Sequence, residues 1–134
     1  MPGYSGTPLP KKLGVKAGFR VQMANAPAEV LAELSAALTN CKILKRGDAP
    51  DFVMLFSTSR AELAEEFSRW AKSLAPAGML WVSWPKKSSG VLTDLNENLV
   101  REIGLHEGLV DVKVCAVTEI WSGLKFVRRL KDRS

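Results

Sequence analysis

The sequence predicts one α/β domain over residues 1–134, with a three-layer, mostly parallel sheet that ends in a C-terminal antiparallel hairpin. Apolar runs of strand length at 52–56 and 79–84 suit parallel strands that helices cover on both faces. In residues 59–74 between them, the apolar side chains recur at the spacing of an amphipathic helix. Residues 110–116 alternate apolar and polar side chains, which indicates a half-exposed strand. Helices joining parallel strands by right-handed crossovers then give layers on both faces of the sheet.

In the first half of the chain, strands are expected at 19–24 and 41–44, with a helix from about 27 to 38 between them. Asn25 or Ala26 would lie near the cap of this helix, and Pro27 would lie in its first turn. Its buried face would hold Val30, Leu34, Ala37 and Leu38. Residues 1–18 are rich in proline and glycine, so we expect an extended arm with at most a short helical turn, lying over the domain.

In the second half, Ser59 and Glu62 form a capping box that starts a helix, and Pro76 with Gly78 ends it. A third helix is predicted from Thr93 as its cap to Gly104 as its stop. The hairpin would turn at residues 121–123 and continue as a strand over 124–130. The predicted buried faces of the two helices are Leu63, Phe67, Trp70, Ala71 and Leu74, and then Leu95, Leu99, Val100 and Ile103.

The net charge of +5 is concentrated at the two ends of the chain. Residues 1–20 and 125–134 each carry a net charge of +4, whereas residues 21–124 carry −3. Such ends, including a basic tail at 128–134, are typically solvated, so nucleic acid is an unlikely partner. No apolar run reaches the roughly 20 residues of a membrane span. No signal-peptide core is visible. We therefore expect a cytoplasmic protein with no membrane partner.

The sequence predicts no metal, no cofactor and no catalytic residue. Cys41 and Cys115 lie in apolar runs without CxxC spacing, which favours reduced, buried thiols. Asp94 and Glu97 are spaced for a helical metal site, but acids in a first turn stabilise a helix dipole without any metal. His106 is the only histidine and is interpreted as a surface or capping residue rather than a general base. Of the tryptophans 81, 84 and 121, Trp84 is the candidate wall of a pocket, although core packing is favoured for all three.

The layout resembles a shortened class I S-adenosylmethionine methyltransferase. Residues 19–24 match that family's first strand, 52–56 its fourth, and the Leu-Ala-Pro-Ala-Gly segment at 74–78 its Leu-x-Pro-Gly-Gly joint. The resemblance implies a Rossmann-like fold whose third strand is missing here. The family's donor site needs a glycine-rich turn after the first strand and an acid ending the second. Residues 24–27 contain no glycine and the second strand leads into Lys45 and Arg46, so we expect neither the usual donor site nor a dinucleotide site.

A second resemblance covers nearly the whole chain. The segments 4–14, 84–95, 108–117 and 121–126 resemble a family of small bacterial proteins catalogued as a domain of unknown function. This resemblance implies a compact intracellular protein and adds nothing about its activity.

A candidate anion site follows from the expected topology, because ligands of open parallel sheets bind beyond the carboxyl ends of the strands. Three segments should meet there. They supply Asn25, then Ser57, Thr58, Ser59 and Arg60, and then Lys86, Lys87, Ser88 and Ser89. The first two segments also open helices, whose free N–H groups favour anions. The competing interpretation is that Asn25 and Ser59 act only as helix caps and that the lysines belong to a solvated surface loop.

Three classes of function are therefore open. The first is a protein that binds an anionic small molecule, or a partner, at the carboxyl edge of the sheet. The second is a divergent methyltransferase, and the third is an adaptor that uses its basic ends on nucleic acid or protein. The half-exposed hairpin leaves a sheet edge that a second copy could cover, so the protein is expected to be a monomer or a homodimer.

Overall fold

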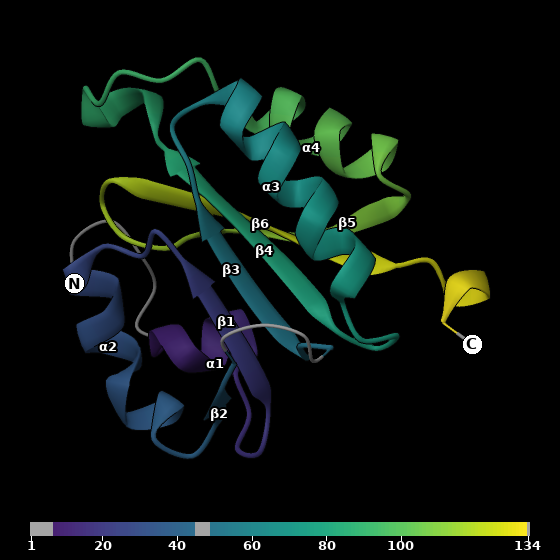
Figure 1. Ribbon diagram of the computed structural model, residues 1–134. Helices are drawn as coiled ribbons and strands as arrows, with labels where there is room; N and C mark the ends of the chain where they lie inside the picture. The colour runs from purple at the N-terminus through teal and green to yellow at the C-terminus, as the bar shows by residue number, and fades with distance from the viewer. Residues whose placement is uncertain (1–6, 45–48, 134) are drawn as a thin grey trace.

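The computed structural model describes residues 7–44 and 49–133 (Figure 1). Its six strands form one sheet in the order β2-β1-β3-β4-β6-β5. Strands β2, β1, β3 and β4 run parallel, and β6 and β5 add antiparallel to β4. The predicted mostly parallel sheet with a C-terminal hairpin is confirmed. The strands are β1 Arg20–Ala24, β2 Lys42–Ile43, β3 Phe52–Phe56, β4 Met79–Pro85, β5 Leu109–Ala116 and β6 Trp121–Arg128.

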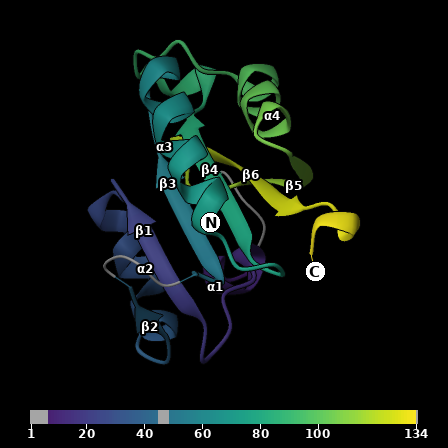
Figure 2. The ribbon, with the colours of Figure 1, turned by 45° about the vertical axis from the view of Figure 1, so that its right-hand side comes forward.

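Helices cover both faces of the sheet, as Figures 1 and 2 show. The α3 and α4 helices lie on one face, and α1 and α2 lie on the other. The helices are α1 Leu9–Leu13, α2 Ala28–Leu38, α3 Arg60–Ser73 and α4 Glu97–His106, with short 3-10 turns η1 Lys87–Ser89 and η2 Leu130–Asp132. Within residues 7–44 and 49–133, no helix combines the length and the apolar character needed to cross a bilayer.

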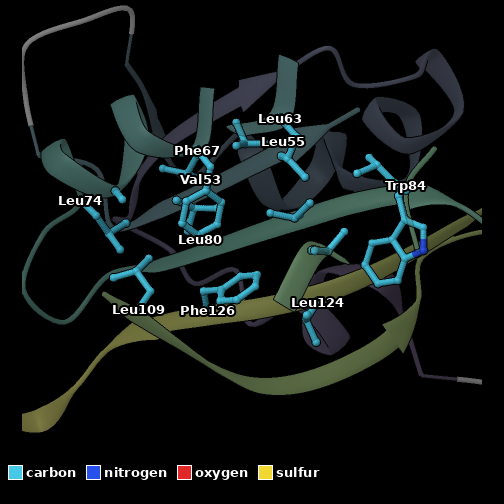
Figure 3. Packing of buried hydrophobic residues seen from close by; sticks show 14 residues of the cluster. Val53, Leu55, Leu63, Phe67, Leu74, Leu80, Trp84, Leu109, Leu124 and Phe126 are labelled. Atoms are coloured by element: carbon cyan, nitrogen blue, oxygen red, sulfur yellow. The ribbon is translucent and has the colours of Figure 1, made fainter. Parts of the chain in front are cut away.

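Fourteen buried residues form the core between the sheet and the α3–α4 layer, and Figure 3 shows side chains of α3 meeting those of β3, β4, β5 and β6. Phe67 of α3 meets Phe126 of β6 edge to face, with ring centroids 5.1 Å apart. The α3 helix is tied to β6 at its other end, where the Arg128 guanidinium donates hydrogen bonds to the carbonyls of Ala71 and Leu74. Arg128 therefore belongs to β6 and not to a free basic tail.

The second core, on the α1–α2 face, includes part of the N-terminal segment. Leu9 and Leu13 of α1 are buried, and the Leu13 carbonyl accepts a hydrogen bond of 2.9 Å from the indole N–H of Trp81. The described part of the segment lies over the sheet and contains a short helical turn, as expected, but this turn is packed into the core. Residues 1–6 of the expected arm lie outside the described residues. Leucines four residues apart bring one helical face to the sheet, and Gly14 ends the helix with a left-handed φ of 82°.

The third predicted helix is shifted along the chain. Asn96, not Thr93, caps α4, because the Asn96 side-chain oxygen accepts the Leu99 N–H at 2.9 Å. Gly104 does not stop this helix but lies inside it, buried against Phe126. The expected turn at 121–123 is also wrong, since these residues belong to β6. The chain turns instead at 117–120, where the Thr118 hydroxyl accepts the N–H groups of Ile120 and Trp121.

The edge strand β5 is half-exposed, as predicted, but its valines are not on a buried face. Val112 and Val114 are 54% and 52% exposed. A register shift between Asp111 and Lys113 interrupts the pairing of β5 with β6. The irregularity changes which side chains face the core, and such bulges are a common means of protecting sheet edges. Cys41 and Cys115 are partly buried, whereas the sequence predicted buried thiols.

Candidate functional site

The carboxyl ends of β1, β3 and β4 lie at one edge of the sheet, followed by the three segments singled out from the sequence. The switch in strand order falls between β1 and β3. Asn25 follows β1 with a left-handed φ of 60°, a conformation that asparagine tolerates better than most residues. Its side-chain amide donates a 3.4 Å hydrogen bond to the Phe56 carbonyl. The expected role of Asn25 as a helix cap is wrong, because Pro27 occupies that position and Asn25 links two strand ends instead.

The serine segment after β3 is satisfied by its own hydrogen bonds. The Ser57 hydroxyl, buried at 7% exposure, donates to the Ser59 carbonyl and accepts the Ser59 N–H. The Ser59 side chain in turn accepts the N–H of Glu62 at 3.3 Å, so the predicted N-cap of α3 is confirmed. Ser57 and Ser59 therefore stabilise the start of α3.

The N-terminus of α3 already holds a carboxylate from the same chain. Asp94 accepts the backbone N–H of Arg60 at 2.7 Å, and the neighbouring Thr93 hydroxyl donates to the Thr58 carbonyl at 2.7 Å. A negative charge at this position is favourable because it meets the free N–H groups and the positive end of the helix dipole. Asp94 thus fills the anion position that the sequence had suggested for an external ligand. It does not form a metal site with Glu97, which pairs with Arg101 at 2.7 Å.

We expect Asp94→Ala to lower the free energy of unfolding by about 1 kcal/mol, the usual effect of losing a helix cap. Asp94→Asn should lose less, because the amide oxygen can still accept the Arg60 N–H. Equilibrium urea unfolding measures both variants, with the exposed Glu102→Ala on α4 as the control. Equal stabilities of the Asp94→Ala variant and the control would show that this contact contributes nothing.

The lysine segment after β4 borders a cavity with a volume of about 690 Å³. We call it the β4 cavity, and its lining includes Trp84, Lys86, Lys87, Leu92, Asn96 and Glu97. Lys86 is fixed through its backbone N–H, which donates to the Ile120 carbonyl at 2.7 Å. The Ser89 hydroxyl closes the following turn by donating to the Lys86 carbonyl at 2.6 Å.

A second cavity of about 410 Å³ is lined by Thr58, Ser59, Leu92, Thr93 and Asp94. Leu92 and Thr93 line both cavities, so the loop of residues 90–96 stands between them. The structure therefore divides the candidate cluster rather than assembling it into one site. Lys86 and Lys87 line the larger cavity, Thr58 and Ser59 line the smaller one, and neither cavity is lined by Asn25, Ser57, Arg60, Ser88 or Ser89.

The charges around the β4 cavity leave two lysines unpaired. Glu97 is paired with Arg101, and hydrogen bonds to Glu97 and then to Asp111 raise the pKa of the Arg101 guanidinium. In the parts of the chain that the structure describes, neither Lys86 nor Lys87 forms an ion pair.

Trp84 adds a polar group to the same cavity. Its side chain is 5% exposed, and its indole N–H donates no hydrogen bond to any of the described residues. This N–H is not among the fully buried polar atoms that lack a partner, so it keeps some contact with solvent. Figure 3 shows Trp84 at one end of the α3–α4 core, where the core meets this cavity. The arrangement can bind an anionic group beside an apolar wall.

His106 is the last residue of α4 and lines neither cavity. Among residues 7–44 and 49–133, no group of three or more histidines, cysteines or acids could hold a metal ion.

No family model and no curated protein matches the chain, so the resemblance to a family of unknown function stays a prediction. The fold is nevertheless similar to solved methyltransferases. Magnesium protoporphyrin IX methyltransferase from Synechocystis PCC 6803, solved with bound SAH, has 13% identity and a TM-score of 0.62 over 90% of this chain and 78% of that one. A SAM-dependent methyltransferase from Aquifex aeolicus has 17% identity and a TM-score of 0.59, over 87% of this chain and 85% of that one.

The fibrillarin pre-rRNA processing protein of Methanococcus jannaschii is also similar, with 13% identity and a TM-score of 0.54 over 94% of this chain and 70% of that one. At these identities the similarity shows the fold alone. The chain thus has the α/β, Rossmann-like methyltransferase fold, with a mixed sheet and C-terminal antiparallel strands.

The structure also describes the turn after β1, where the sequence lacks the glycines of the methyltransferase donor site. The turn after β1 has no glycine, but Asn25 supplies the left-handed backbone conformation that glycine usually adopts. Lys45 and Arg46, which follow the second strand, lie outside the described residues.

Proposed function

We propose that this protein binds a small molecule with an anionic group and a flat apolar body in the β4 cavity. The observation that carries the proposal is that one cavity is lined by two lysines without ion pairs and by a tryptophan whose indole N–H has no partner among the described residues. Lys86 and Lys87 would hold a phosphate or carboxylate, and Trp84 would donate a hydrogen bond to an acceptor of the ligand. A volume of about 690 Å³ lies within the range of small-molecule sites, roughly 300–1,000 Å³.

An apolar residue at the rim supports the proposed character of the ligand. Leu92 is 93% exposed, although it lines both cavities. A ligand with an apolar body would cover this side chain and remove its surface from water, which is favourable by roughly 25 cal/mol per Å² buried. An inorganic anion would gain nothing from Leu92. We therefore expect the cavity to prefer an aromatic phosphate or carboxylate to inorganic phosphate.

Replacing Lys86 and Lys87 together by alanine should abolish binding at this cavity. In a thermal-shift measurement at constant ionic strength, 1-naphthyl phosphate is expected to raise the midpoint temperature of the unmodified protein more than inorganic phosphate does. The double variant should lose this protection because it lacks both cations. The matched control is Lys42→Ala with Lys72→Ala, two exposed lysines that do not line the cavity.

Two results would contradict the proposal. One is the absence of protection by 1-naphthyl phosphate and by naphthalene-1-acetate, since both combine the proposed charge and apolar body. The other is equal protection of the Lys86/Lys87 double variant and the control, because the ligand would then bind elsewhere.

The divergent methyltransferase remains the second candidate function, because the fold is shared with methyltransferases. Titration calorimetry with S-adenosylmethionine tests this alternative on the same preparation. Binding that the Lys86/Lys87 double variant retains would favour a donor site after β1 and argue for the methyltransferase.

A further inference from the structure

Lysines from the N-terminal segment, β5 and β6 are brought together on one face of the sheet, beside α1. Lys113 of β5 and Lys125 of β6 are direct register partners. Lys16 follows α1 in the sequence, and its charge acts on Lys125. We call Lys16, Lys113 and Lys125 the lysine cluster. It lies on the face of α1, opposite the α3–α4 face to which Trp84 of the β4 cavity belongs.

Hydrogen bonds and close contacts hold the cluster in place. The Lys113 ammonium donates to the Lys12 carbonyl at 2.7 Å, which attaches β5 to α1. The Lys12 ammonium donates in the opposite direction, to the Ala116 carbonyl at 2.7 Å. A Cβ placed on Gly14 would stand 4.0 Å from the Lys125 ammonium nitrogen, so this charge lies against the end of α1. The ammonium groups of Lys113 and Lys125 are therefore positioned by contacts with α1, whereas Lys16 is exposed.

The positive charge of the cluster is not neutralised by acidic side chains. None of its three lysines forms an ion pair within residues 7–44 and 49–133. Like charges directly opposite each other on neighbouring strands destabilise a sheet. Burial lowers the pKa of the Lys125 ammonium, and the charges of Lys113 and Lys16 lower it further. Nearby lysines also act on the Cys115 thiol. Burial raises the pKa of this thiol, and the charges of Lys12 and Lys113 reduce the shift.

We propose that the lysine cluster binds a free, multiply charged phosphate anion of the pyrophosphate or triphosphate class. Three ammonium groups match the charge of such an anion, and each offers donors to its oxygens. A bound anion would also remove the repulsion between Lys113 and Lys125, so binding and folding should reinforce each other. This site is separate from the β4 cavity and does not depend on the proposed function.

The test measures thermal protection and calorimetric affinity for inorganic pyrophosphate, with chloride adjusted to keep the ionic strength constant. Lys113→Gln with Lys125→Gln should weaken the binding of pyrophosphate by about tenfold or more, since charged hydrogen bonds of this kind are each worth roughly that factor. Lys42→Ala with Lys72→Ala, two exposed lysines outside both proposed sites, should leave it unchanged. The unliganded Lys125→Gln variant should be at least as stable as the unmodified protein, because it loses a repulsive charge. Circular dichroism verifies that each variant is folded.

Three results would overturn the proposal. Pyrophosphate could protect no better than chloride at equal ionic strength, or it could protect the Lys113/Lys125 variant as well as the unmodified protein. A single-stranded oligonucleotide could bind with an affinity that rises with its length while pyrophosphate gives no protection, which would indicate a nucleic-acid surface. If the Lys113/Lys125 variant is unfolded, Lys16→Gln replaces it, and an unchanged affinity in that variant also counts against the proposal.

Discussion

The replacement Gly104→Ala is expected to lower the free energy of unfolding by about 3 kcal/mol, at the upper end of the usual cost of overpacking. A methyl group on Gly104 would stand 2.0 Å from Cε1 of Phe126 and within 2.6 Å of two more atoms of that ring. Phe126 has no exposed surface and meets Phe67 edge to face, so it cannot simply move away. Helix propensity alone predicts the opposite sign, since alanine is favoured over glycine by about 1 kcal/mol inside a helix.

Urea unfolding of a double-mutant cycle separates the clash from other effects. In a Phe126→Leu background the smaller side chain leaves room for the new methyl group, so Gly104→Ala should cost much less there than in the unmodified protein. If the two substitutions are additive, or if Gly104→Ala alone stabilises the protein, the close approach of α4 and β6 does not limit stability.

Gly104 also shows why a correct fold prediction contained wrong boundaries. Near the end of an apolar stripe, a glycine has the local pattern of a helix stop. Here its role is to admit a ring from a strand that follows more than 15 residues later in the sequence. Gly123 is similar, because Val117 and Trp81 occupy the space where its Cβ would be. In both cases the deciding partner is remote, so local sequence could not reveal it.

The elements that were predicted correctly depend on local signals. The apolar run at 52–56 became β3, which is buried along its whole length, and Ser59 caps α3 as its spacing with Glu62 indicated. The only local signal for α1 was the spacing of Leu9 and Leu13, which lie four residues apart in a proline-rich segment. It was too brief to separate a helix in the core from an arm on the surface.

In the candidate site, too, the sequence identified residues with a local signal and missed those whose role depends on a remote contact. Lys86 and Lys87 were found from the sequence because they directly follow a strand whose end is easy to locate. The role of Asp94 could not be found, since its hydrogen bond reaches Arg60, 34 residues earlier in the chain. Two members of the lysine cluster, Lys16 and Lys125, had a sequence signal in the excess charge at both chain ends, whereas Lys113 had none. What the sequence lacked was the register that places Lys113 opposite Lys125 and the contact that brings α1 to them.

The replacement Trp81→Ala is expected to lower the free energy of unfolding by about 3–5 kcal/mol, the usual range for removing a large buried aromatic side chain. Trp81 has no exposed surface and lies at the centre of β4 in the α1–α2 core. Its indole N–H is also bonded to the Leu13 carbonyl, 68 residues away. The variant therefore leaves a cavity and an unpaired carbonyl at the end of α1. Trp121→Ala, in a partly exposed residue of β6, is the matched control in urea unfolding.

Trp81→Phe isolates the attachment of α1, because it keeps an aromatic ring but removes the N–H. It should cost less stability than Trp81→Ala, while loosening the residues that carry Lys12 and Lys16. If α1 helps to position the lysine cluster, this variant should bind pyrophosphate more weakly and still bind 1-naphthyl phosphate in the β4 cavity. Loss of both ligands together would instead indicate general unfolding. Unchanged pyrophosphate affinity would show that Lys113 and Lys125 form the anion site without α1.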